Sequence, residues 1–279
     1  MIKFAVAIDG LKYSESAIQY AAFLSNEAQA HLVGIFLDDF SYHTYRISDL
    51  VKNKETVDEK LTVFENKDKI IREQAVHNFE EVCRRFHLNF SVHHDRNIAI
   101  TELLHESVYT DLLIIDSKET LTNYPENVPT RFIRDLLSEV QCPIVIVPKI
   151  YEPVKKIFLL YDDGPSSVYS IKMFSYLFPS FKNVTAEVIS VNAPDQSLHL
   201  PDIRLMKEFM KRHFPDAAYK VMQGSPEKEI LHYLKEQKES GMVVLGAYDR
   251  GMVSRWFKHS MADVLMKEIR FPLFIAHNK

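Results

Sequence analysis

The chain has 279 residues, 46% of them hydrophobic and 26% charged, which is ordinary for a folded globular protein and long enough for two domains. Lysine and arginine number 34 and aspartate and glutamate 38, so the formal net charge of −4 excludes the strong positive balance of a dedicated nucleic-acid-binding protein. Only 7 glycines are present, about a third of the usual share, which leaves little material for glycine-rich phosphate loops.

Cysteine spacing and apolar runs bear on the compartment. Cys83 and Cys142 form no CxxC pair, so the sequence predicts neither a redox motif nor a zinc site and is typical of a reducing cytoplasm. The apolar runs 112–115 and 144–147 are far shorter than the ~20 residues that a membrane span needs. We therefore expect a cytoplasmic protein without a membrane or nucleic-acid partner.

In the first half, short apolar runs alternate with stretches of helical periodicity. Apolar residues at helical spacing indicate helices within 17–24, 71–86 and 100–108. Runs of Val, Ile and Leu without alternation are typical of strands covered on both faces. Such strands are predicted at 4–9, 31–37, 90–93, 111–116 and 144–147. The polar stretch between Asp38 and Lys60 is expected to be a surface loop or a helix extension.

The second half repeats the same order. Strands are predicted at 157–160, 185–191, 217–222, 241–246 and 273–276, and helices within 171–178, 203–213 and 230–234. Two prolines bracket the aperiodic stretch 148–153 between the copies. The sequence thus predicts an α/β chain of two domains, 1–149 and 154–279, each a five-stranded, mostly parallel sheet with helices on both faces.

This repeated order resembles the universal stress protein family in its tandem, two-domain form. The resemblance is carried by first strands that end in Asp-Gly, the turn Gly224-Ser225-Pro226, the run Val243-Val244-Leu245-Gly246-Ala247, and the closing strands after Cys142-Pro143 and Phe271-Pro272. It implies two Rossmann-like domains of the adenine nucleotide alpha hydrolase type, packed as an internal pseudo-dimer. The last strands, 144–147 and 273–276, are then expected to pair with each other. Whether the chain also forms a homodimer stays open.

Nucleotide-binding members of that family carry the motif G-x2-G-x9-G followed by Ser or Thr after the fourth strand. Glycines let the main chain wrap the phosphates, and the hydroxyl opens the next helix. In the second half these positions hold Gly246, Asp249, His259 and Ser260. In the first half they hold Asp116, Glu119, Pro129 and Thr130, so no glycine remains. We expect triphosphate binding in the first half to be very weak or absent.

The resemblance therefore confines a nucleotide site to the second half. The predicted cofactor-binding residues there are Asp163, Gly246, Asp249, Arg250, His259 and Ser260. Asp9 and Asp163, the latter ahead of Asp162, match the family's aspartate near the adenosine. Asp-Gly pairs also make turns, and Ser260 and Thr130 also suit helix N-caps, without any ligand. No cofactor is required, and ATP in the second half is expected to bind weakly.

The sequence shows no catalytic or metal-binding constellation. GxSxG, HExxH, GxxxxGK[ST] and GxGxxG are all absent, and the adjacent His93 and His94 point to opposite faces of their strand. This absence favours a non-enzymatic protein, and the resemblance implies a role in the stress response through binding of a protein partner or a small molecule. Two alternatives stay open: an ATP-binding switch or slow ATPase that uses the second half, and binding of an apolar ligand between the halves.

Overall fold

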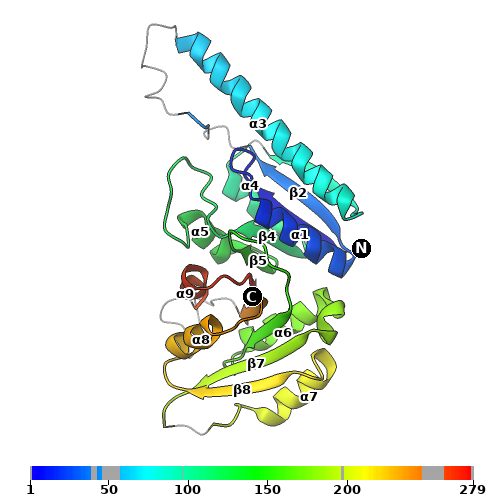
Figure 1. The fold of residues 1–279 in the computed structure, drawn as a ribbon, viewed down its shortest axis with the longest axis vertical. Helices are drawn as coiled ribbons and strands as arrows, with labels where there is room; N and C mark the ends of the chain where they lie inside the picture. The colour runs from blue at the N-terminus through cyan, green and yellow to red at the C-terminus, as the bar shows by residue number, and fades with distance from the viewer. Residues whose placement is uncertain are drawn as a thin grey trace.

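The computed structural model describes residues 2–38, 43–45, 57–95, 97–195, 198–246 and 261–277. Within them, ten strands form one continuous sheet in the order β3-β2-β1-β4-β5-β10-β9-β6-β7-β8. The two halves of the chain follow one another along this sheet, and each contributes five neighbouring strands (Figure 1). No helix in this part of the chain is long and apolar enough to cross a membrane.

The first half alternates strands and helices, and its strands are all parallel to one another. Its elements are β1 (Lys3–Ile8), α1 (Glu15–Ala28), β2 (His31–Leu37), α3 (Val57–Arg85), β3 (Phe90–Asp95), α4 (Ala99–Val108), β4 (Leu112–Asp116), α5 (Arg131–Glu139) and β5 (Ile144–Val147).

The second half repeats this arrangement, again with parallel strands. Its elements are β6 (Lys156–Leu160), α6 (Pro165–Leu177), the 3-10 helix η1 (Pro179–Asn183), β7 (Thr185–Asn192), α7 (Ile203–His213), β8 (Ala218–Gln223), α8 (Pro226–Lys235), β9 (Gly241–Gly246), α9 (Met261–Glu268) and β10 (Leu273–Ala276). The predicted fold class is confirmed. The domain boundaries 1–149 and 154–279 stay a prediction.

Helix α3 is longer than the sequence predicts. It begins at Val57 and runs for 29 residues, whereas apolar periodicity indicates a helix only from Ile71 onward. Val63 and Ile70 are exposed on its first half. The buried core residues of the helix are Ala75, Phe79 and Cys83 on its second half, which is why the apolar periodicity begins late. Figure 1 shows the first half of the helix (cyan) projecting beyond the sheet.

Strands β5 and β10 join the two halves. They pair antiparallel, with Val145 opposite Phe274, so the predicted pairing of the last strands is confirmed. The pairing removes two exposed sheet edges that could otherwise pair with other chains. Two apolar cores, one on each face, run across this junction. One lies under α1, α3, α6 and α7, and the other under α4, α5, α8 and α9.

Phe274 anchors the junction on the first of these faces. Its ring is fully buried and makes edge contacts with Phe174 at 5.1 Å and Phe178 at 6.4 Å between ring centroids. We expect Phe274→Ala to lower the free energy of unfolding by about 3–5 kcal/mol, because it removes a large buried side chain and leaves a cavity. Urea denaturation measures the change.

Ile150→Ala is the matched control, since Ile150 is 69% exposed. It should change the free energy of unfolding by less than about 0.5 kcal/mol. Similar losses for the two variants would contradict the role assigned to Phe274.

Candidate functional site

The carboxyl ends of β1 and β4 meet at one edge of the sheet, where open α/β folds place their ligands. Asp9 directly follows β1 and is buried. Its Oδ1 accepts hydrogen bonds from the main-chain N–H groups of Leu11, at 2.8 Å, and Lys12, at 3.2 Å. This is the turn role that an Asp-Gly pair predicts.

On the β4 side of this edge, the main chain closes around one of its own carboxylates. Glu119 Oε1 accepts hydrogen bonds from the N–H groups of Thr120 and Leu121, each at 2.8 Å. Glu119 is only 8% exposed. Two successive N–H groups directed at one oxygen form the kind of nest that binds an anion. The chain therefore fills its own nest.

Two of the three other motif positions of the first half, Asp116 and Thr130, are also engaged in internal hydrogen bonds. Asp116 Oδ2 accepts from the Ser14 hydroxyl at 2.5 Å, and its Oδ1 accepts from the Lys118 N–H at 2.8 Å. The Thr130 hydroxyl accepts from the N–H of Ile133 at 3.2 Å, which makes it the predicted N-cap of α5.

Two cationic side chains, Lys12 and Arg72, lie at this edge of the sheet. Lys12 Nζ lies 4.0 Å from Asp9 Oδ2 and donates to the Thr120 hydroxyl at 3.3 Å. Arg72, on α3, places its Nε 3.2 Å from Asp38 Oδ1. Its Cγ would lie 3.0 Å from a Cβ added to Gly10, so the arginine stem packs closely on the β1–α1 turn.

Sequence reasoning missed both cations. Lys12 lies two residues after the Asp-Gly turn, and this short separation could have indicated that its ammonium group lies at the site. Arg72 carries no such signal, because it reaches the turn from a helix more than 60 residues along the chain. Among the described residues, no three His, Cys, Asp or Glu side chains group as metal ligands.

The environment of Glu119 changes its acidity. Burial, followed by the nearby negative charge of Asp9, raises the pKa of Glu119 to about 7. The hydrogen bonds from Leu121 and Thr120 and the charge of Lys12 oppose this rise.

In the second half, the sheet register decides which aspartate corresponds to Asp9. Phe4 pairs with Leu32 and Leu112, as Ile157 pairs with Ala186 and Met242. Phe4 and Ile157 are thus equivalent positions, and the fifth residue after each is Asp9 and Asp162, respectively. The sequence alignment above puts Asp163 first instead. Asp162 makes the corresponding turn, because its Oδ1 accepts from the N–H of Gly164 at 3.0 Å.

Asp163 takes the next position. Its backbone lies in the left-handed region, with φ of 69°, and its Oδ1 accepts from the Tyr161 hydroxyl at 3.3 Å. The predicted residues Asp163 and Gly246 follow or end the neighbouring strands β6 and β9. Asp249, Arg250, His259 and Ser260 lie outside the described residues. The predicted cofactor site therefore stays a prediction.

Gly246 has a structural explanation that needs no ligand. A Cβ at this position would lie 2.6 Å from the carbonyl carbon of Ser166 and 2.7 Å from its oxygen. These are main-chain atoms at the start of α6, so they cannot move aside cheaply. Close packing of β9 against α6 requires glycine here.

We expect Gly246→Ala to lower the free energy of unfolding by about 1–3 kcal/mol in the absence of any nucleotide, through overpacking. Thermal and urea denaturation of the two proteins measure the loss. In Gly164→Ala the new Cβ would meet only the carboxylate end of Asp162, which can rotate, so the loss should be smaller. Unchanged stability of Gly246→Ala would leave ligand contact as the reason for glycine.

Glu119→Gln tests the buried carboxyl, because glutamine keeps an oxygen acceptor for both N–H groups. The native carboxyl holds its proton up to about pH 7, whereas an unfolded glutamate loses it near pH 4.5. Unfolding therefore releases a proton between these values, and rising pH removes stability. Relative to Glu119→Gln, the wild type should lose on the order of 1–3 kcal/mol as pH rises from about 4.5 to about 7.

Urea denaturation in steps from about pH 4.5 to about pH 8 measures this difference. Two stability curves that run parallel over the whole range would show that Glu119 ionises normally in the folded protein.

Comparison with known proteins finds the same architecture. No protein-family profile matches the chain, and no curated sequence matches it. A universal stress protein from Archaeoglobus fulgidus DSM 4304 superposes with a TM-score of 0.71 at 11% identity, covering 99% of this chain and 98% of that one. Two proteins from Pseudomonas aeruginosa superpose with TM-scores of 0.61, each covering 99% of this chain and 92% of its own. One is a putative universal stress protein, at 12% identity, and the other is of unknown function, at 13%. The chain therefore has the two-domain fold of the universal stress proteins, as its sequence resemblance implies.

Proposed function

We propose that this chain is a non-enzymatic stress-response protein that acts by binding a protein partner or a small molecule, and that its first half takes no nucleotide. The stress role is carried over from the fold likeness. The observation that carries the rest is the Glu119 carboxylate, held at 2.8 Å by the N–H groups of Thr120 and Leu121. These groups stand where a phosphate-binding loop would need vacant donors.

In the first half, a triphosphate would find the main-chain donors already occupied and would be repelled by negative charge. It would have to displace the Glu119 carboxyl, whether protonated or charged, from two hydrogen bonds. A phosphate charge ~4 Å from the Asp116 carboxylate would cost about 1 kcal/mol in water and about 4 kcal/mol at an effective dielectric of 20. Lys12 offers limited compensation, because it already contacts Asp9 and Thr120.

The surroundings of Cys83, Cys142 and Ser175 support binding rather than catalysis. Burial raises the pKa of Cys83 and of Cys142 to about 12, so neither thiol ionises near neutrality. Ser175 lies against His213, but it also donates to the carbonyl of Lys172. Burial and the charges of Lys182 and Lys172 lower the pKa of His213, and no carboxylate orients this described pair as a catalytic base would need.

The two alternatives differ in what supports them. Among the described residues, a cavity at the junction of the halves measures about 180 Å³, which is small for a ligand site. Its walls are mostly apolar, with Ile146, Met266 and Phe271 among them, but Lys118, Lys149 and Lys267 also border it. A nucleotide switch in the second half depends on residues outside the described part of the chain, and packing already explains Gly246. We therefore keep the switch as an outcome of the test.

Calorimetric titration of Mg·ATP into the wild type, Ser260→Ala and Glu119→Gln tests the proposal. We expect no saturation below about 1 mM in any of the three, since the filled nest blocks one half and the motif of the other retains one glycine. Ser260→Ala is preferred to a change at Gly246, because the glycine is required for packing. Native mass spectrometry of protein from its own cells should then show a retained small molecule or partner.

Micromolar affinity that is lost in Ser260→Ala but kept in Glu119→Gln would replace this proposal with the nucleotide switch. Micromolar affinity that changes in Glu119→Gln would show that the first half binds after all.

A further inference from the structure

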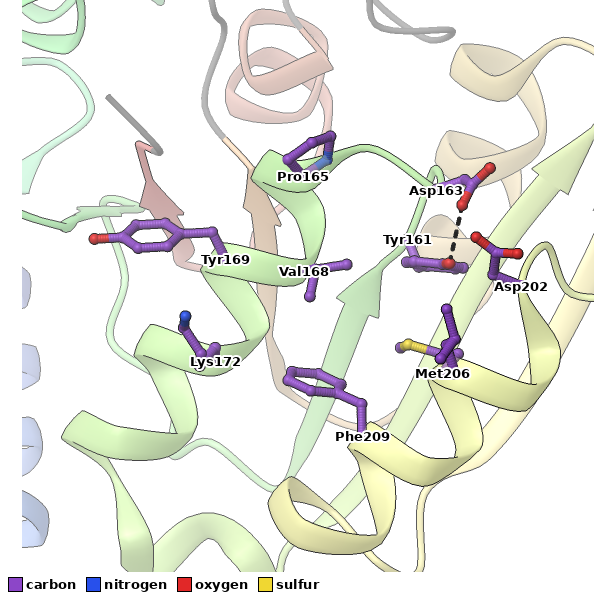
Figure 2. Close-up of a pocket in the computed structure, with 10 residues that line it drawn as sticks. Tyr161, Asp163, Pro165, Val168, Tyr169, Lys172, Asp202, Met206 and Phe209 are labelled. Carbon is purple, nitrogen blue, oxygen red and sulfur yellow. Dashed lines mark hydrogen bonds between the residues drawn. The ribbon is translucent and has the colours of Figure 1, made fainter.

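A pocket of about 410 Å³ opens between α6 and α7 in the second half (Figure 2). This volume lies in the range of small-molecule sites, which combine apolar walls with a few convergent polar groups. The walls here are Val168 from α6 and Leu205, Met206 and Phe209 from α7. Leu205 is 57% exposed, so the rim presents an apolar surface that the core does not use.

One end of the pocket is acidic. Figure 2 shows the carboxylates of Asp163 and Asp202 side by side there, next to the ring of Tyr161. The Tyr161 side chain is 3% exposed, and its hydroxyl lies 3.3 Å from both Asp163 Oδ1 and the carbonyl oxygen of Pro201. Apolar walls lead directly to two carboxylates and an aromatic ring.

Asp202 lies where its side chain could cap helix α7, but it does not do so. It occupies the N-cap position of α7, where an aspartate commonly accepts a hydrogen bond from the first turn. Its side chain makes no such bond, and its φ of 44° lies in the left-handed region. Helix capping therefore does not explain this carboxylate.

The first half shows that the fold does not require the acidic end. The register that matches Asp162 with Asp9 matches Asp163 with Gly10. On the neighbouring helices, Met206 and Met210 face the core as Phe79 and Cys83 do. Each pair lies 12 and 8 residues before the corresponding strand positions, Ala218 and Ser91. This matches Asp202 with Ala75. Both acids are thus peculiar to the second half.

Two of the four apolar wall residues are also peculiar to the second half. The same alignment matches Val168 with Glu15 and Leu205 with Asn78. Phe209 corresponds to Val82. The cavity beside α1 and α3 in the first half is bordered instead by charged side chains, including Glu15, Glu81, Arg84 and Arg85.

We propose that the α6–α7 pocket binds a small organic cation: a single amine on an aryl or short alkyl body. The ammonium group would lie between Asp163 and Asp202 against the Tyr161 ring, and the body would lie against Val168, Met206 and Phe209. Lys172 borders the opposite end of the pocket and disfavours a second positive charge, so a diamine is excluded (Figure 2). This inference rests on the proposed function only in that the chain binds a small molecule.

Three probes of one shape test the charge. They are 2-phenylethylamine, the neutral 2-phenylethanol and the anionic 3-phenylpropanoate. Titrations followed by saturation-transfer NMR give each affinity, and methyl labelling of methionine locates binding through the Met206 signal. We expect the amine to saturate at or below about 1 mM and to shift that signal, with the other two probes at least tenfold weaker.

Variants separate the two parts of the site. Asp163→Asn with Asp202→Asn should weaken amine binding at least tenfold, since it removes both charges. Met206→Phe copies Phe79 of the first half and fills the pocket, so it should abolish binding while keeping both acids. Asn78→Leu, at the matched position of the first half, should change nothing. Thermal denaturation checks that each variant folds.

The proposal fails if the amine does not saturate or if the alcohol binds equally well. It also fails if the double variant or Met206→Phe retains wild-type affinity while thermal denaturation shows that the variant is folded. None of these outcomes changes the result expected from the Mg·ATP titration. The proposed function therefore does not depend on this site. Conversely, micromolar ATP binding would overturn the proposed function and leave the amine result to stand by itself.

Discussion

Two hydrogen bonds from consecutive main-chain N–H groups to the Glu119 carboxyl fill the nest at the end of β4 in the first half. A loop at the end of β4 that wraps an anion must satisfy its N–H groups, because buried donors without partners are costly. Here an acidic side chain of the same loop satisfies them. The loop therefore keeps its shape without a ligand, and Asp116, Thr130 and Lys12 are drawn into the same internal network.

The two halves show how one fold diverges when each copy is held in place by the other. Pairing of β5 with β10 makes one sheet, and the two apolar cores continue across it. The two halves differ at the carboxyl ends of their strands and in the grooves between their helices. The first half uses them for charged side chains that close its own edge, and the second keeps an apolar groove that ends in Asp163 and Asp202.

Local chemistry explains which features the sequence could predict. Buried strands, the Asp9 turn and the Thr130 N-cap each depend on residues within a few positions, and all three are confirmed. Which aspartate corresponds to Asp9 depends on a one-residue register between strands that are far apart in the chain. The register gives Asp162, whereas sequence alignment favoured Asp163. Arg72 and the α6–α7 pocket arise from packing between distant helices, which no spacing in the sequence reveals.

The most direct test of the filled nest is to observe its two amides. NMR signals of the Thr120 and Leu121 N–H groups should follow a single titration near pH 7, because they donate to the Glu119 carboxyl, whose pKa is raised to about 7. They should not move when Mg·ATP is added to millimolar concentration. Saturable shifts of both amides with ATP would contradict the account, since they would show that a phosphate displaces the carboxyl.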